Sequence, residues 1–275
     1  MIYADSHTHS VFSFDGHQSV DELCRSAIEK GIQKIALTDH LDCDGEFEGY
    51  YDHYDAEGAK KAVLEAREKY EGKVEIAYGV ELGQPYTHPK ETRTLIEKQG
   101  FDFIIGSLHN LVGVPDFCML DYTKMTDRQI ELLWQRDLDE TYRLLLDEGT
   151  HGCKIDTLAH LTYPVRYILR AGKTLDMKPF IEQIEQIFLR LIEKGIALEI
   201  NTSGLRQGAG MTFPDESLMR FYRSLGGEMV TVGSDAHFSE HVGCNIRETY
   251  ELLREIGFSY VCYFGHNGLT QISLN

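Results

Sequence analysis

Histidine and carboxylate side chains stand at the ends of several expected strands, where they could bind metal ions. Two pairs, His7 with His9 and Asp235 with His237, are spaced at i and i+2, so in an extended segment both members point to the same side and can hold one ion. Imidazole nitrogen together with carboxylate oxygen suits zinc, iron or manganese. The full set of candidate ligands is His7, His9, Asp15, His40, Glu81, His109, His160, Asp235 and His237. Nine ligands are too many for one ion and suit about three, if a carboxylate bridges and water fills the open positions.

A histidine taken alone is weak support for a metal site, because it more often makes a hydrogen bond at the surface or in the core. Six of the 12 histidines, however, fall at strand ends on one expected rim. The other six are expected in loops or at helix margins as solvated polar groups: His17, His53, His88, His151, His241 and His266.

Short β-prone runs alternate along the chain with longer segments whose apolar residues have helical spacing. Strands are expected near residues 2–5, 34–38, 74–80, 101–107, 157–159, 197–200, 229–232 and 260–264. Helices are expected near residues 20–30, 56–70, 90–98, 126–148, 178–194, 215–225 and 244–256. Several expected helices are followed by a glycine suited to the left-handed conformation at a helix end: Gly31, Gly72, Gly100, Gly149, Gly195 and Gly257.

Seven or eight such units, with no break in composition, predict an α/β fold with parallel strands closed into a β/α barrel. A doubly wound sheet is the alternative. In a barrel the carboxyl ends of the strands converge on one mouth, so the candidate ligands would meet there.

The chain has 275 residues and a formal net charge of −17, from 27 Lys and Arg against 44 Asp and Glu. So acidic a chain lacks the basic surface with which proteins bind long nucleic acids. No apolar run reaches the roughly 18 residues that span a bilayer, and the first residues lack the pattern of a secretory signal. The six scattered cysteines are expected as reduced thiols. We therefore expect one domain over residues 1–275, in the cytoplasm, without a membrane partner; the oligomeric state stays open.

Six short motifs, in order along nearly the whole chain, resemble the polymerase and histidinol phosphatase (PHP) family. They are D-S-H-T-H-S at the start, T-D-H at 38–40, G-V-E-L-G at 79–83, G-S-L-H at 106–109, L-A-H at 158–160 and G-S-D-A-H at 233–237. The segment E-I-N-T-S-G-L-R at 199–206 is similar to the histidinol-phosphate phosphatase branch. The resemblance implies a distorted seven-fold, TIM-like β/α barrel with three divalent ions (zinc, iron or manganese) at its mouth.

The resemblance also implies how the ligands are shared among the ions. His7, His9, Glu81 and Asp235 would hold the first ion, and Glu81 would bridge to a second ion held by His109 and His160. The third ion would take Asp15, His40 and His237. Many relatives have histidine at the position of Asp15, and an aromatic residue would be expected at that of Asn110.

For such a centre we expect hydrolysis of a small phosphate monoester, with L-histidinol phosphate of histidine biosynthesis as the substrate. A hydroxide that bridges two ions is a nucleophile near neutral pH, and it would attack the phosphorus in line. Glu81, Asp235 and His237 are the expected catalytic residues. Arg206 is the first candidate for binding the phosphate and Arg166 the second, because a planar guanidinium matches phosphate with two hydrogen bonds.

Three alternatives remain open at this point. One is a phosphoesterase of the same family that acts on nucleotides or other small phosphate esters. The second is an amidohydrolase-type enzyme, which would typically use a bridging lysine instead of Glu81. The third is a metal-binding module without catalysis.

The acidic segment 42–48 after the second expected strand carries a further hypothesis. Asp42, Asp44 and Glu46 would overhang the mouth and attract the ammonium group of an amino-alcohol substrate, although a solvated acidic loop is the more ordinary interpretation.

Overall fold

The structure, a computed structural model of the chain, describes residues 1–48, 54–146 and 153–275, with the side chains of residues 46 and 47 left out. Its centre is a parallel sheet of seven strands in the order β1 (Ala4–Thr8), β2 (Lys34–Leu37), β4 (Glu75–Gly83), β5 (Phe103–Ser107), β6 (Thr157–Leu158), β7 (Ala197–Asn201) and β8 (Val230–Gly233). A parallel bridge from Thr8 to Ala236 brings the first strand next to the last. The sheet is therefore nearly closed, and the predicted seven-fold barrel is confirmed over the doubly wound alternative.

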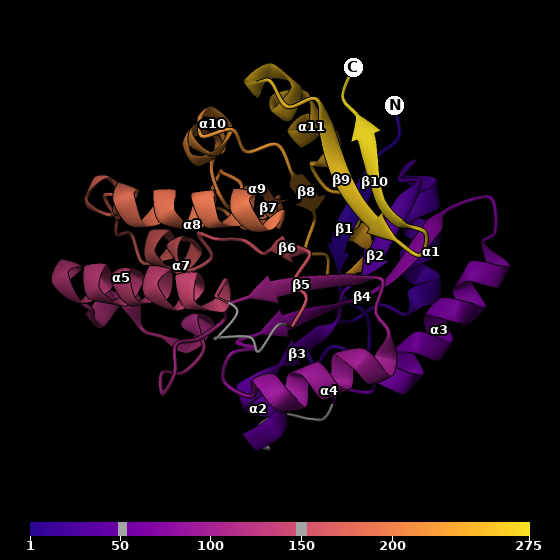
Figure 1. Cartoon of the computed structure of the whole chain (residues 1–275), viewed down its shortest axis with the longest axis horizontal. Coiled ribbons are helices and arrows are strands. Elements are labelled where there is room, and N and C mark those ends of the chain that lie inside the picture. Colours follow the sequence, from indigo (N-terminus) through magenta and orange to yellow (C-terminus); the bar gives the residue numbers. More distant parts are fainter. Residues whose placement is uncertain (49–53, 147–152) are drawn as a thin grey trace.

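Helices lie between successive strands on the outside of this sheet (Figure 1). The seven expected helices are present as α1 (Val20–Glu29), α3 (Ala56–Lys69), α4 (Pro89–Gln99), α5 (Asp127–Leu144), α8 (Ile181–Lys194), α10 (Glu216–Ser224) and α11 (Ile246–Ile256). Shorter helices are α2 (Cys43–Glu48), α7 (Val165–Arg170) and α9 (Ser203–Arg206), with 3-10 turns at Phe117–Met119, Tyr122–Lys124, Lys178–Phe180 and Ser239–His241. The expected end of the fourth helix at residue 148, and the glycine expected to follow it, Gly149, lie outside the described residues.

Local sequence signals explain where helices begin and end. Ser19 caps α1 through a hydrogen bond from the Glu22 backbone, and the Glu22 side chain bonds back to Ser19, which satisfies two otherwise free N–H groups. Gly100 and Gly195 end α4 and α8 in the left-handed conformation, with φ of 64° at each, which a glycine adopts without steric cost.

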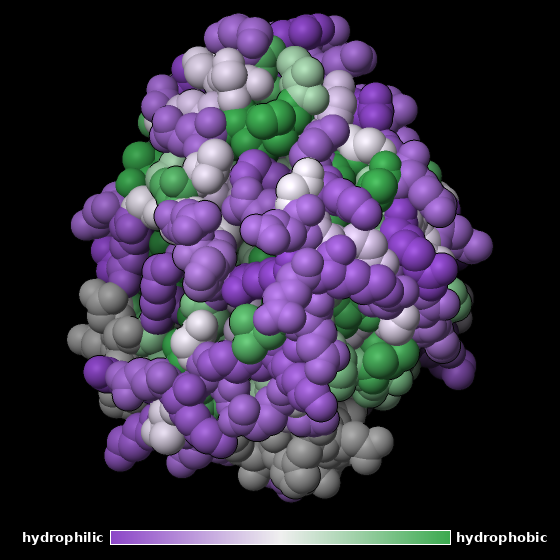
Figure 2. Space-filling model, turned by 90° about the vertical axis from the view of Figure 1, so that its right-hand side faces the viewer, coloured by the Kyte–Doolittle hydropathy of each residue, from purple (hydrophilic) through white to green (hydrophobic). Residues whose placement is uncertain are grey.

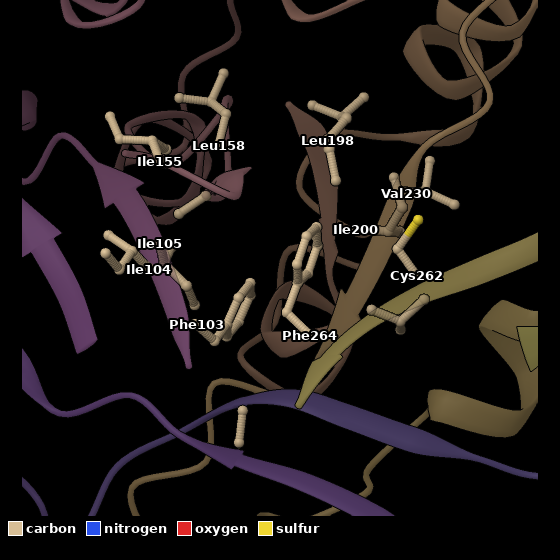
Figure 3. Close-up of a cluster of buried hydrophobic side chains, with 14 of the residues drawn as sticks. Phe103, Ile104, Ile105, Ile155, Leu158, Leu198, Ile200, Val230, Cys262 and Phe264 are labelled. Carbon is tan, nitrogen blue, oxygen red and sulfur yellow. The ribbon is translucent and has the colours of Figure 1, made fainter. Parts of the chain in front are cut away.

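The last expected strand is present as β9 (Tyr260–Gly265), but it pairs antiparallel with β10 (Gly268–Ser273) rather than joining the barrel. Figure 3 shows Phe264 and Cys262 of β9 among side chains of the barrel strands, including Phe103 and Ile200. The rings of Phe264 and Phe103 stack with centroids 5.3 Å apart, and Phe103 is the first residue of β5. The Tyr263 hydroxyl donates to the carbonyl of Ile35, near the start of β2, at 2.9 Å. The hairpin thus packs against the amino-terminal ends of the strands, opposite the mouth.

A three-residue strand, β3 (His40–Asp42), was not expected from the sequence. It pairs in parallel with the second half of β4 and places His40 directly opposite Glu81. The chain after β2 therefore returns to the sheet and delivers a histidine to the mouth.

On the side where α3 lies, hydrophilic side chains predominate and hydrophobic ones form small groups (Figure 2). Within the described residues, every helix is either too short or too polar to cross a bilayer.

We predict that Phe264→Ala lowers the free energy of unfolding by about 3 kcal/mol, because it removes a large side chain from the packed end of the barrel. Zinc binding should be unchanged, since the hairpin lies at the other end of the strands. Denaturation with urea measures the stability. Leu269→Ala in β10 is the matched control, because the Leu269 side chain is 47% exposed and its loss should cost little. A Phe264→Ala variant as stable as this control would contradict the assigned packing.

Candidate metal centre

The nine candidate ligands come together at the carboxyl ends of the strands. His7 lies in β1, His40 opens β3 and Glu81 lies in β4, while the others follow β1, β5, β6 and β8. Seven of the nine line one cavity of about 360 Å³: Asp15, His40, Glu81, His109, His160, Asp235 and His237. His7 and His9 have no exposed surface and lie beneath them. Chain segments more than 200 residues apart in the sequence thus build a single site.

Glu81 is the centre of this site. Its Oε2 lies 3.1 Å from Nε2 of His7 and 3.0 Å from Nδ1 of His40. Its Oε1 lies 3.1 Å from Nε2 of His109 and 2.9 Å from Nε2 of His160. Burial disfavours the charged carboxylate, but the surrounding imidazoles, His7 first among them, outweigh this effect and hold the pKa of Glu81 well below its usual value. With histidines against both oxygens, Glu81 can bridge two ions.

The pair of His7 and His9 adjoins Asp235. Nε2 of His9 lies 3.3 Å from Oδ1 of Asp235, and Nε2 of His7 lies 4.0 Å from the same oxygen. Asp235 adopts a φ of 55°, a left-handed conformation that is uncommon for a residue other than glycine. Its N–H donates to the carbonyl of His7 at 2.8 Å, so the unusual backbone is held by β1 itself. One oxygen of Asp235 is thereby fixed beside both imidazoles.

Asp15 lies between His40 and His237 at the outer edge of the site. Its Oδ2 is 3.0 Å from Nε2 of His237, and its Oδ1 is 3.7 Å from Nε2 of His40. Burial raises the pKa of Asp15, but the hydrogen bond to His237 and the charge of His40 overcome this and hold it below its usual value. The rings of His40 and His237 both stack on His9 with centroids 4.2 Å apart. Asp15, His40 and His237 can hold an ion beside the two ions that Glu81 can bridge.

Two carboxylates that the sequence analysis did not place in the site orient the histidines from behind. Oε1 of Glu199 lies 2.6 Å from Nδ1 of His7, and its Oε2 accepts from the backbone N–H of His160 at 2.8 Å. Oδ1 of Asp42 lies 2.7 Å from Nδ1 of His109. A carboxylate on the far nitrogen fixes the tautomer and orientation of a metal-binding imidazole. Both belonged to segments that the sequence analysis quoted, but nothing in the spacing marked them as partners of histidine.

The structure corrects the hypothesis about the acidic segment. Asp42 is buried against His109 and does not overhang the mouth. Asp44 accepts hydrogen bonds from the side chains of Gln84 and Asn110. The side chain of Glu46 lies outside what the structure describes. Asp42 and Asp44 are therefore already engaged by residues of the site and its surroundings.

Gln84 fixes the backbone of His109. It is fully buried and adopts a φ of 48°, and its Oε1 accepts from the N–H of His109 at 3.0 Å. Its amide nitrogen also donates to the side chain of Asn110. Asn110, where an aromatic residue was expected, thus joins a polar network behind the ligand His109.

The side chains present fit metal ions. In the described part of the chain, three buried atoms at the centre have charged neighbours at 3.0–3.7 Å but none in hydrogen-bonding geometry: Nε2 of His9, Nδ1 of His40 and Oδ1 of Asp15. Buried polar atoms are rarely left without a partner, and a bound cation would supply one. Imidazoles mixed with carboxylates are the ligands that zinc, iron and manganese accept.

Both candidate arginines line the cavity, but their surroundings differ. Arg166 is 5% exposed and lies over the ring of Tyr163, and its Nη2 donates to Ser203 at 2.6 Å and lies 3.7 Å from Oδ2 of Asp235. The terminal nitrogens of Arg206 donate to the carbonyls of Ser234 and Asp235. Arg206 therefore connects α9 to the segment after β8 through both of its terminal nitrogens. Arg166 uses only one terminal nitrogen in a hydrogen bond, so its guanidinium has more donors left for a ligand.

The other six histidines had been expected to stay outside the site. His241 lines the cavity without joining a group of metal ligands in the described structure. His17, His88 and His266 do not line the cavity. His53 and His151 lie outside the described residues.

Comparisons with known proteins relate the chain to the PHP domain and to histidinol-phosphatases. A sequence model of the PHP domain matches residues 5–203. A protein of Thermotoga maritima named "Probable histidinol-phosphatase" is 30% identical over 97% of both chains. The histidinol-phosphatase of Lactococcus lactis is 26% identical over 94% of this chain and 93% of its own length.

The fold is also that of a solved structure. The crystal structure of histidinol phosphate phosphatase from Lactococcus lactis, in complex with zinc, L-histidinol and phosphate, superposes with a TM-score of 0.80. It is 22% identical in sequence, and the match covers 98% of each chain.

We predict that Glu199→Gln weakens zinc binding about 10- to 100-fold, although it removes no direct ligand, because an amide cannot accept from both His7 and His160. Titration of the metal-free protein with zinc against a chelating dye measures the affinity. Glu193→Gln on the exposed surface of α8 is the matched control. Equal zinc affinity of the two variants would show that Glu199 does not orient the ligands.

We further predict that zinc affinity rises as the pH is increased from 7 to about 9. Burial lowers the pKa of His40, but Glu81 and Asp15 raise it to about 9, so the metal-free protein holds this proton at neutral pH. A coordinating imidazole must be neutral, so zinc binding releases the proton below that pH. Calorimetry in two buffers of different ionisation enthalpy counts the protons released. His40→Gln should release fewer than the unchanged protein, and an equal number would contradict the prediction.

Proposed function

The chain belongs to the PHP domain family, and from this premise we propose that it hydrolyses L-histidinol phosphate to L-histidinol and phosphate as a metal-dependent phosphomonoesterase. Two relatives that match over almost its whole length, those of Thermotoga maritima and Lactococcus lactis, carry histidinol-phosphatase names. The observation that carries the proposal is the arrangement around Glu81, where imidazoles and carboxylates of six strand ends face one cavity beside two arginines.

We propose that the centre holds three divalent ions of zinc, iron or manganese. His7, His9, Glu81 and Asp235 would hold the first, and Glu81, His109 and His160 the second. His40 and His237, with Asp15, would hold the third. Groups of ligand atoms within 4.8 Å of one another support the first two sets: His7, His9 and Glu81, and Glu81, His109 and His160. A further group joins His40 and His237 with His9, and Asp15 lies 3.0 Å from His237 and 3.7 Å from His40.

Bound ions would lower the pKa of water and offset the negative charge that builds up on the phosphoryl oxygens. Glu81, Asp235 and His237 are the proposed catalytic residues, because each lines the cavity among the proposed metal ligands. Arg166 would bind a phosphate oxygen, since its guanidinium is held in place by Ser203 and Tyr163 at the edge of the ligand cluster. Arg206 would fix Asp235 through the backbone and present its charge to the same phosphate.

The alternatives differ in how they fit this geometry. An amidohydrolase-type centre would have a lysine in the bridging position, whereas here the carboxylate of Glu81 from β4 occupies it. A module without catalysis would not need a cavity of about 360 Å³ over the ligands.

We also propose that residues 1–275 work as one domain and that the enzyme acts in the cytoplasm in histidine biosynthesis. Its six cysteines are free thiols.

We predict that the metal-loaded protein hydrolyses L-histidinol phosphate with a kcat/KM at least about 100-fold above that for a nucleoside monophosphate or p-nitrophenyl phosphate. Such a ratio reflects recognition of the alcohol, which the metal centre alone does not provide. Treatment with EDTA should abolish all three activities, and zinc or manganese should restore them. Similar slow rates on all three esters would retain the phosphoesterase chemistry and refute the proposed substrate.

A further inference from the structure

One carboxylate in the wall of the metal cavity differs from the rest in its surroundings. Five carboxylates line this cavity: Asp15, Asp42, Glu81, Asp116 and Asp235. Four of them lie within 4.0 Å of a histidine or arginine nitrogen. Asp116 makes no ion pair with any residue that the structure describes. It is therefore the one carboxylate of the described wall whose charge is left for a ligand.

Asp116 is held in a defined position. Its Oδ1 accepts from the N–H of Cys118 at 2.7 Å, which caps the turn Phe117–Met119. The N–H of Phe117 donates to the carbonyl of His109 at 2.9 Å. The turn that carries Asp116 is thus tied by the backbone to a proposed metal ligand, and the hydrogen bond from Cys118 restricts the carboxylate in the wall of the cavity.

Asp116 also stands where the metal cavity meets a second cavity. This neighbouring cavity, of about 710 Å³, shares Asp116 and Met119 with the first. Met119 is 67% exposed and offers an apolar surface at the same place. A substrate whose phosphate lies among the arginines and ligands would extend its alcohol portion past these two residues.

The two charged groups of the proposed substrate require binding-site groups of opposite sign. Its phosphate needs cations, whereas its ammonium group, on the carbon next to the one that carries the ester oxygen, is repelled by them. A carboxylate without a cation partner, close to the phosphate site, satisfies the second requirement. Asp42 cannot do so because it pairs with the imidazole of His109, and Asp44 accepts from two side-chain amides and does not line the metal cavity.

We propose that Asp116 binds the ammonium group of the amino-alcohol phosphate and so determines which phosphate esters the enzyme accepts. This inference rests on the function proposed above. It assigns substrate recognition to the turn after β5, and not to the acidic segment after β2.

The test compares two esters that differ only in the amine: L-histidinol phosphate and 3-(imidazol-4-yl)propyl phosphate. In the zinc-loaded protein, Asp116→Asn should lower kcat/KM for L-histidinol phosphate about 10- to 100-fold, the range of a charge-assisted hydrogen bond, and mainly by raising KM. It should leave kcat/KM for the ester without the amine unchanged. Asparagine still accepts from the Cys118 N–H, so the turn is kept. Asp121→Asn is the matched control, because Asp121 caps the next turn, does not line the cavity and carries the same charge.

An equal loss on both esters would show that Asp116 only shapes the wall, and no loss on either would remove it from recognition; both results overturn the inference. A second measurement needs no variant. L-histidinol should inhibit the unchanged enzyme at least about 10-fold more strongly than 3-(imidazol-4-yl)propan-1-ol; equal inhibition would also overturn it. Failure of the proposed function is a separate result, since it appears as a lack of preference of the unchanged enzyme for L-histidinol phosphate over p-nitrophenyl phosphate.

Discussion

The rest of the molecule is arranged around one buried carboxylate, that of Glu81, whose two oxygens lie within 3.5 Å of five imidazoles. A carboxylate without exposed surface loses several kcal/mol of hydration, so this position is tenable only with positive charge around it. That charge must come from side chains of other strands, because β4 itself supplies none. A closed parallel sheet makes this possible, since the ends of all its strands point to one place.

The proposed ligands are in turn held in place by side chains that bond to their far nitrogens or to their backbone. Glu199 and Asp42 fix the rings of His7 and His109 from behind, and Gln84 holds the backbone of His109. Asp235 and Gln84 both adopt left-handed backbone conformations, which cost on the order of 1 kcal/mol or more and persist only in rigid surroundings. The hairpin β9–β10 contributes to this rigidity from the opposite end of the barrel. Stability and function are therefore placed at different ends of the same strands.

The sequence predicts those features of the site that follow from strand geometry. The i and i+2 spacing of His7 with His9, and the position of ligand-type residues after each strand, suffice to bring the nine candidates together. Glu199 and Asp42 escape such reasoning, because a carboxylate within or beside a strand has no spacing that identifies its partner. Strand β3 is missed because three residues are too few to show a β-prone run. The antiparallel pairing of β9 is missed because such a run shows that a strand forms, but not which neighbour it pairs with. The glycine-rich loop after Arg206 also suggested that this arginine is free to bind phosphate. In the structure, its terminal nitrogens donate to two backbone carbonyls.

The join between β1 and β8 has a consequence for how the protein reaches its final form. Near the mouth, the N–H groups of Asp235 and His9 donate across this join to the carbonyls of His7 and Ala236. Ligands from both sides of the join belong to the same centre, and the two sides lie far apart along the chain. During synthesis, His7 and His9 are made long before Asp235, with which they would share an ion. Binding of that ion would therefore be a late event, and it would stabilise the protein at the place where the first strand meets the last.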